Sequence, residues 1–144
     1  MTEIPLKWRD WLPYGDAFRF VDTIELLDLP RRLVTSADFS RHDELVAAHR
    51  IVEATIPGVL LAEQAAQSAW LLGRCSGWFE EMDKVLLGRL NCTFEGSALR
   101  GATIQADVEL VTSTATEAGF RAVLSTTGQH LAKVIIAVKR LEPA

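Results

Sequence analysis

The stretch IPGVLLAEQAAQSAWLLG, residues 56–73, decides the fold. Between Gly58 and Leu72 it is rich in Leu, Ala, Glu and Gln and has no internal proline or glycine, which favours a helix. Pro57 suits the start of this helix and Gly73 suits its end. Apolar residues occupy nearly its whole circumference, so we expect the helix to be buried on most sides, at the centre of the fold.

Two polar residues on this helix are candidates for function. Glu63 and Gln67 stand four residues apart, so they share one helix face and would form its only strongly polar stripe. An acidic residue on such an apolar helix is unusual. The plainer interpretation is that the Glu63 carboxylate reaches solvent or a neighbour. Gln67 fits a hydrogen-bonding residue that orients a site better than it fits a reactant.

The sequence on both sides of the helix has β patterns. Residues 19–28 and 32–39 predict a hairpin around Pro30 and Arg31. After Gly77 the pattern alternates with period two and predicts four strands, at 86–96, 103–114, 119–128 and 130–141. A short helix near Trp8–Leu12 should end at Pro13 and Gly15, and residues 40–56 are irregular. Two strands, a buried helix and an antiparallel meander define an α+β fold.

Length and composition predict one domain over residues 1–144, with 49% hydrophobic and 24% charged residues. The net charge of −4 argues against a general affinity for nucleic acid or anionic membranes. Polar residues interrupt the apolar stretch 57–73, and the N-terminal residues lack the apolar core of a secretory signal. We therefore expect a cytoplasmic protein. Cys75 and Cys92 lack metal or redox spacing and fit buried apolar positions.

Three stretches resemble the small 3-hydroxyacyl-(acyl carrier protein) dehydratases of bacterial fatty acid synthesis. LPYGDAFRFVD, residues 12–22, resembles that family's opening LPHRYPFLLVD, and IPGVLLAEQAAQ, residues 56–67, resembles its MPGVLxxEAxAQ. Counting back from Pro57 places the family's catalytic histidine, in GHFPGNPxMPG, on His49 without a gap. GRLNCTFEGSALRGATIQADVEL, residues 88–110, is similar to the family's xKFRxPVxPGDxL region. The resemblance covers nearly the whole chain.

This resemblance implies a hotdog fold, in which a curved antiparallel sheet wraps the long helix and two subunits pair edge to edge. It implies dehydration of a 3-hydroxyacyl thioester to a 2-enoyl thioester, in fatty acid or polyketide biosynthesis. The substrate would be carried by acyl carrier protein or coenzyme A, without a cofactor or a metal ion. The assembly would be a homodimer, a heterodimer with a related hotdog subunit, or a larger oligomer, with the catalytic pockets at the subunit interface.

The resemblance also assigns roles to residues. His49 becomes the base that removes the proton next to the thioester carbonyl, and Glu63 of the other subunit becomes the acid that helps the hydroxyl leave. Gly58 becomes the backbone donor to the carbonyl oxygen, and Val59 and Gln67 complete the substrate site. Burial on the helix should raise the pKa of Glu63 and keep a proton available.

The chain departs from the family pattern at three places. The family's GHFPG is replaced by Ala48-His49-Arg50-Ile51-Val52, so the glycines and the proline around the histidine are gone. Tyr14 and Gly15 stand where the family has its early histidine and arginine. Gly101-Ala102 replaces the family's GD turn. These departures predict a divergent member.

Two other functions stay open on the same fold. Hotdog thioesterases also place an acidic residue on the central helix, so hydrolysis of a thioester is one alternative. The other is a non-catalytic subunit that pairs with an active relative.

Several other residues have both a functional and a plain interpretation. Arg50, Arg89 and Arg100 would form a basic rim for a carrier protein or a coenzyme A phosphate, or else a solvated face. The tryptophans would line an acyl tunnel or, by default, pack in the core, and they are Trp8, Trp11, Trp70 and Trp78. His42 and His130 match no motif and are expected at the surface.

Overall fold

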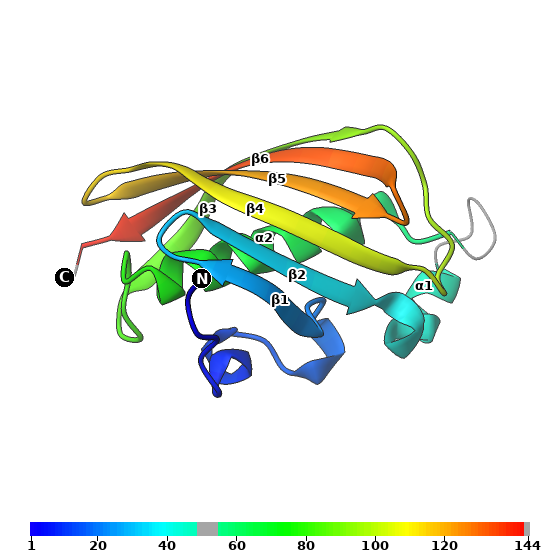
Figure 1. Cartoon of the computed structure of the whole chain (residues 1–144), viewed down its shortest axis with the longest axis horizontal. Coiled ribbons are helices and arrows are strands. Elements are labelled where there is room, and N and C mark those ends of the chain that lie inside the picture. The colour runs from blue at the N-terminus through cyan, green and yellow to red at the C-terminus, as the bar shows by residue number, and fades with distance from the viewer. Residues whose placement is uncertain (49–54, 143–144) are drawn as a thin grey trace.

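One long helix and one antiparallel sheet contain most of the residues that the computed structural model describes, which are 1–48 and 55–142. The strands are β1 (Thr23–Asp28), β2 (Arg32–Asp38), β3 (Lys84–Phe94), β4 (Thr103–Ser113), β5 (Glu117–Thr126) and β6 (Gln129–Leu141). The helices are α1 (Asp43–Ala48), α2 (Gly58–Cys75) and the short 3-10 helices η1 (Trp8–Trp11), η2 (Asp16–Phe18) and η3 (Phe39–His42). The sheet curves over one side of α2 (Figure 1). This confirms the predicted α+β arrangement.

Helix α2 begins at Gly58, as the sequence predicted, and it is buried on most sides. It ends at Cys75 rather than at Gly73, so the predicted end is wrong by two residues. Gly73 lies within the last turn, where an added Cβ would be 3.2 Å from Cε1 of Phe79. The absence of a side chain at Gly73 therefore allows the Phe79 ring to pack closely against α2. The chain turns only at Gly77, whose φ is 76°. In the described part of the chain, no helix is long and apolar enough to cross a membrane.

The sheet has six strands in the order β1-β2-β4-β5-β6-β3, and every neighbouring pair is antiparallel. The hairpins β1–β2, β4–β5 and β5–β6 follow the sequence prediction. Strand β3 does not, because it pairs with β6 at the far edge instead of leading the meander beside β4. The connection 95–102 is held to the start of α2 by a hydrogen bond from Ile56 N to Ala98 O of 2.9 Å. The chain leaves β3 at one edge of the sheet and enters the sheet again at β4, between β2 and β5.

The core lies between α2 and the concave face of the sheet. Alternate residues of β6 face the helix and are buried, namely Ala132, Val134, Ile136 and Val138. The residues between them face outward, including the half-exposed Ile135. The same alternation occurs in β4 and β5. The alternation of buried and exposed residues thus gives the sheet one apolar face, which packs on α2, and one outer face, which is exposed to solvent.

The N-terminal segment packs on the side of α2 that the sheet leaves open (Figure 1). Trp8 is buried, and the indole N–H of Trp70 donates to the carbonyl of Trp11 at 2.9 Å. The guanidinium of Arg74 lies 4.8 Å from the Trp11 ring centroid. Trp8, Trp11 and Trp70 therefore take part in packing the N-terminal segment against α2. This agrees with the default expectation that the tryptophans pack in the core.

Candidate active site

Glu63 lies one and a half turns into α2 and is partly buried. Burial raises the pKa of its carboxyl, and the hydrogen bond from Gln67 Nε2 to Glu63 Oε1, 3.1 Å long, offsets only part of that rise. The direction is the one that the sequence predicted for this residue. A carboxyl group in such a setting keeps its proton to higher pH than a solvated one.

Gln67 connects Glu63 to the backbone of residues 18–20. Its Oε1 accepts a hydrogen bond from Phe20 N at 2.8 Å, and its Nε2 donates to the Phe18 carbonyl at 2.8 Å. The side chain is 1% exposed, and it bonds to Glu63 as well. The Gln67 amide therefore holds residues 18–20 of the N-terminal segment against α2, next to Glu63. Gln67 is thus a hydrogen-bonding residue, and its role in orienting a site stays a prediction.

The same short segment is held from its other side by η3. The carbonyl of Arg19 accepts hydrogen bonds from Nε2 of His42 at 2.9 Å and from Nη2 of Arg41 at 3.1 Å. The His42 ring lies 4.5 Å from the Phe20 ring and is 8% exposed. The expectation that His42 is a surface residue is therefore wrong, whereas His130 is exposed as expected.

The contacts of the His42 side chain explain how it can be buried. Its ring contacts apolar side chains while one ring nitrogen bonds to a backbone carbonyl, so its polar group is satisfied. Burial lowers the pKa of His42. The imidazole therefore resists protonation more than a solvated histidine. The local sequence does not signal this, because the Arg19 carbonyl that binds the ring lies 23 residues away and the Phe20 ring comes from the same distant segment.

Tyr14 is near enough to Glu63 for the carboxylate charge to act on its phenol. Its ring packs on that of Phe18 with centroids 5.3 Å apart, and Phe18 is the residue whose carbonyl Gln67 binds. Burial and the nearby Glu63 carboxylate both raise the pKa of the Tyr14 phenol. In the sequence, Tyr14 is only a departure from the family pattern. The structure brings it to the candidate site.

The start of α2 forms a second part of the candidate site. Gly58 and Val59 precede the first intrahelical hydrogen bond, from Leu60 N to Pro57 O, so their N–H groups belong to the donor end of the helix. Val59 is 73% exposed. A hollow of about 380 Å³ opens here, lined by Thr55, Ile56, Gly58, Val59, Leu61, Phe94, Gly96 and Ser97.

Phe94, at the end of β3, lies directly against Gly58. A Cβ added at Gly58 would be 2.7 Å from Cε1 of Phe94, so only glycine fits without movement of that ring. The resemblance explained this glycine by the close approach of substrate. In the structure, a ring of the chain itself takes the space beside Gly58. Phe94 is 51% exposed, so the ring has room to move.

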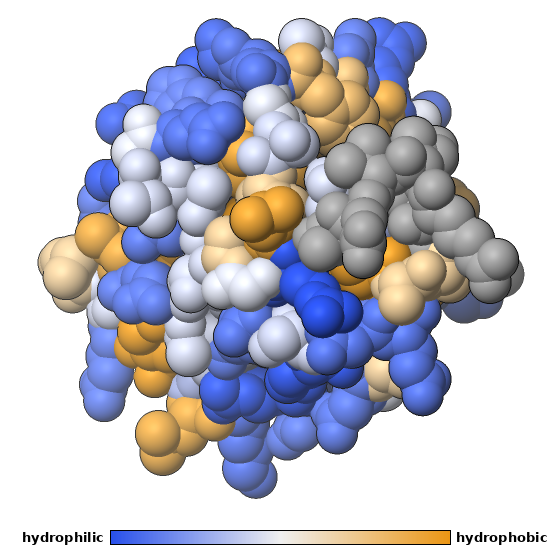
Figure 2. Space-filling view, turned by 90° about the vertical axis from the view of Figure 1, so that its right-hand side faces the viewer, coloured by the Kyte–Doolittle hydropathy of each residue, from blue (hydrophilic) through white to orange (hydrophobic). Residues whose placement is uncertain are grey.

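His49 lies outside the described residues, and so does Arg50 of the suggested basic rim. The described residues just before His49 border a hollow of about 650 Å³, lined by Ala17, Phe18, Arg41, His42, Asp43, Glu44, Leu45 and Ala48. This end of the molecule faces the viewer in Figure 2, where apolar and polar surfaces meet.

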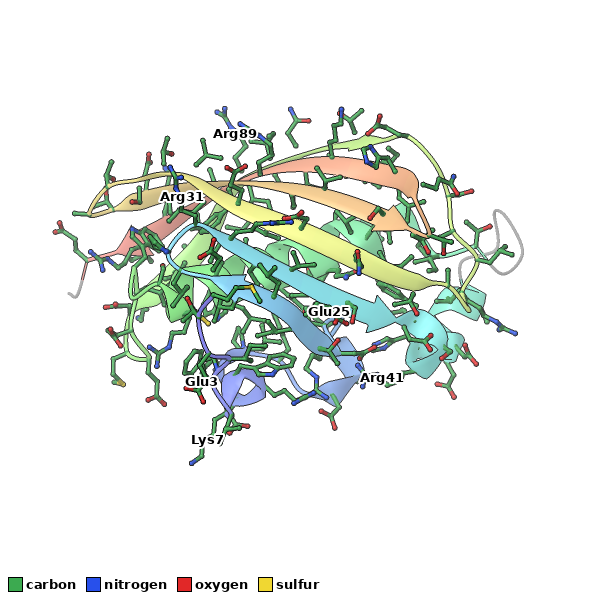
Figure 3. All side chains as sticks on the ribbon, in the orientation of Figure 1. Glu3, Lys7, Glu25, Arg31, Arg41 and Arg89 are labelled. Atoms are coloured by element: carbon green, nitrogen blue, oxygen red, sulfur yellow. The ribbon has the colours of Figure 1, made fainter. Side chains whose placement is uncertain are left out.

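The other two arginines of the suggested rim do not lie together. Arg89 points away from α2 on the outer face of the sheet (Figure 3), in register with Ala137 of β6. Arg100 lies after β3 with its guanidinium 4.0 Å from the Asp43 carboxylate at the start of α1. Arg89 and Arg100 therefore lie on different surfaces of the protein.

The described residues contain no group of three or more histidines, cysteines, aspartates or glutamates that could hold a metal ion. Cys75 and Cys92 are partly buried free thiols. Burial raises the pKa of Cys75 to about 11 and also raises that of Cys92, so both thiols are poor nucleophiles at neutral pH.

Comparison with known proteins identifies the fold. No protein-family model matches the chain, and no curated protein matches it. Among solved structures, a chain of the dehydratase heterocomplex ApeI:P from Xenorhabdus doucetiae is similar, with a TM-score of 0.77, 15% identity, and coverage of 96% of this chain and 93% of that one. A hypothetical thioesterase protein with coenzyme A from Streptococcus pneumoniae has a TM-score of 0.66, 12% identity, and coverage of 83% and 84%.

A mutant of the phenylacetic acid degradation protein PaaI from Thermus thermophilus is also similar, with a TM-score of 0.64 and 18% identity, covering 83% of this chain and 92% of that one. Identities this low establish the fold alone. The chain has the hotdog fold, with its central helix wrapped by one antiparallel sheet. The expected hotdog fold is therefore confirmed, whereas the roles of His49, Gly58, Val59, Glu63 and Gln67 stay predictions.

Proposed function

We propose that the chain dehydrates a 3-hydroxyacyl thioester as one subunit of a hotdog dimer. The observation that carries this proposal is the partly buried acid Glu63, whose pKa is raised and whose carboxyl is held by Gln67 on the central helix. A carboxyl group that holds its proton to higher pH than a solvated one is better suited to protonate a leaving hydroxyl. The resemblance of residues 12–22 and 56–67 to dehydratase motifs supports the same reaction.

The reaction balances with two protein groups. His49 takes the proton from the carbon next to the thioester carbonyl, and the electron pair of that C–H bond becomes the new carbon–carbon double bond. The C–O bond at the next carbon breaks, and the leaving hydroxyl takes the proton of Glu63 to depart as water. The N–H groups of Gly58 and Val59 would stabilise charge on the carbonyl oxygen. Phe94 must shift to admit the thioester there, because its ring lies against Gly58.

The edge strand β3 supports a dimer. It exposes large apolar side chains along its length, with Leu86 at 54%, Leu87 at 55% and Leu90 at 36% exposed. An exposed apolar edge strand tends to pair with another strand. Phe94 ends this strand beside Gly58, so pairing at β3 would bring a second subunit to the helix start. A monomer in sedimentation at micromolar concentration would contradict this part of the proposal.

The decisive assay is incubation with 3-hydroxyacyl thioesters of acyl carrier protein and of coenzyme A, followed by intact mass for loss of water. Glu63→Gln and His49→Ala should each lower dehydration about a hundredfold to ten-thousandfold. Release of free acid instead of an enoyl product would establish the thioesterase alternative. Full activity in both variants would reject these two residues as the catalytic pair.

Mixed dimers test whether the site is shared between subunits. Refolding His49→Ala together with Glu63→Gln gives about half mixed dimers if pairing is random and twofold. Each mixed dimer combines two unaltered residues in one site, so roughly a quarter of wild-type activity should return. Mixed dimers without activity would rule out a shared site.

A second candidate function is that of a partner subunit, and the ApeI:P heterocomplex favours it. The chain would then pair through β3 with a different hotdog subunit that carries the active site. Co-purification of a second hotdog chain, with dehydration that survives His49→Ala and Glu63→Gln in this chain, would establish that role.

A further inference from the structure

Tyr14 is the single tyrosine of the chain and has no part in the reaction described above. It is 39% exposed, so its ring is partly covered while a part of the side chain faces solvent. The local sequence around it, LPYGD, predicts a turn and gives no reason for an aromatic residue. Its position therefore calls for an explanation beyond the local backbone.

Three contacts connect Tyr14 to Glu63 through Phe18 and Gln67. The Tyr14 ring packs on Phe18 with a centroid separation of 5.3 Å and an interplanar angle of 59°. The Phe18 carbonyl accepts from Gln67 Nε2 at 2.8 Å, and the same nitrogen donates to Glu63 Oε1 at 3.1 Å. A continuous set of contacts thus runs from Tyr14 to the Glu63 carboxyl.

The electrostatics agree with this geometry. Burial raises the pKa of the Tyr14 phenol, and the charge of Glu63 is close enough to raise it further. Burial also raises the pKa of Glu63. Each group therefore holds its proton to higher pH than a solvated group of the same kind, and each is a hydrogen-bond donor in its protonated form.

Resting on the proposed function above, we propose that the Tyr14 hydroxyl is a second donor of the active site. It donates a hydrogen bond to the same substrate oxygen that Glu63 protonates, and it keeps its own proton throughout. The substrate oxygen then has two donors, one of which transfers a proton and one of which only orients and polarises it. The matching substrate is an acyl thioester with a hydroxyl group on the third carbon.

The plain alternative is that Tyr14 only packs on Phe18. Tyr14→Phe removes the hydroxyl and keeps the ring, so it separates the two. We expect kcat for dehydration to fall about tenfold to a hundredfold, the effect of losing one hydrogen bond to a reacting oxygen, with little change in KM. Trp78→Phe is the matched control, since it also removes a hydrogen-bond donor from an aromatic side chain, the indole N–H that donates to the Thr114 carbonyl at 2.8 Å. Trp78 follows the end of α2, away from Glu63 near its start, so this variant should retain most of kcat.

Binding gives a readout that does not depend on turnover. Tyrosine labelled at the ring carbon that carries the oxygen yields one NMR signal, because the chain has one tyrosine. A 3-hydroxyacyl pantetheine amide should shift this signal, whereas the matched acyl amide without the hydroxyl should shift it much less. Titration of the same signal should show a lower pKa for Tyr14 in Glu63→Gln than in the wild type.

The outcomes separate this proposal from the proposed function. Unchanged kcat in Tyr14→Phe, with activity lost in Glu63→Gln, would overturn the role of Tyr14 and leave the dehydratase intact. Equal signal shifts with the two amides, or a Tyr14 pKa unaltered by Glu63→Gln, would also overturn it. Absence of dehydration in the wild type would reject the function, while the response to the hydroxylated amide would still decide whether Tyr14 binds that oxygen.

Discussion

Replacing Gln67 by Met removes the amide that joins α2 to residues 18–20 while it keeps the length of the side chain. Two backbone groups then lose their partners, the N–H of Phe20 and the carbonyl of Phe18. An unsatisfied buried polar group costs about 1–3 kcal/mol, and the Phe18 carbonyl belongs at the lower end because that residue is 46% exposed. We therefore expect the free energy of unfolding to fall by about 2–4 kcal/mol.

Helix α2 supplies its own control for this measurement. Gln64 is also fully buried, but its amide makes a single hydrogen bond, from Nε2 to the Ile104 carbonyl at 3.1 Å. Its Oε1 has no hydrogen-bond partner among the described residues. Gln64→Met loses one bond and also removes an unsatisfied buried oxygen, so these effects nearly cancel. We expect a change of about 1 kcal/mol or less.

Equilibrium unfolding in urea, followed by tryptophan fluorescence at one fixed protein concentration, compares the two variants. Equal destabilisation by Gln64→Met and Gln67→Met would contradict this prediction. So would a free energy of unfolding for Gln67→Met within about 0.5 kcal/mol of the wild type, the usual range of a surface substitution.

Three further predictions concern charge. The pKa of Glu63 is higher in the folded state than in the unfolded state, so protonation of Glu63 favours folding. The free energy of unfolding of the wild type, relative to Glu63→Gln, should therefore fall as pH rises from about 4.3 through the folded pKa. The folded pKa of His42 is lowered, so the wild type should lose stability relative to His42→Gln as pH falls below about 6.5. Urea unfolding across pH measures both differences, and flat difference curves would contradict them. Arg32 bonds both oxygens of Asp107 at 2.9 and 2.8 Å on the open face of the sheet, so Arg32→Gln should cost about 1 kcal/mol or less in low salt, and less still in high salt.

The periodic patterns of the sequence predicted most of the fold. The central helix and the strands on either side follow from the spacing of apolar residues, which local geometry determines. Strand β3 shows the limit of this reasoning. Its alternation predicted a strand, but alternation carries no information on the neighbour, and β3 lies beside β6 rather than β4. Residues 43–48 form the short helix α1, where the sequence was expected to be irregular.

The candidate site was predictable only in part. The spacing of Glu63 and Gln67 placed them on one face, and the hydrogen bond between them confirms it. The other partners of Gln67 lie 47 and 49 residues away in sequence, at distances that no local pattern can reveal. The same holds for the contact between Gly58 and Phe94, which joins the start of a helix to the end of a strand.

The position of β3 also has a consequence during synthesis of the chain. Its one neighbour in the described sheet is β6, which is made after β4 and β5. While the ribosome adds those residues, β3 has no strand within the chain to pair with, and its leucines stay in contact with water. An unpaired apolar strand in a nascent chain is open to misassociation. We therefore expect soluble yield to depend on chaperones or on early capture by another subunit, and any truncation that removes β6 to fail by aggregation.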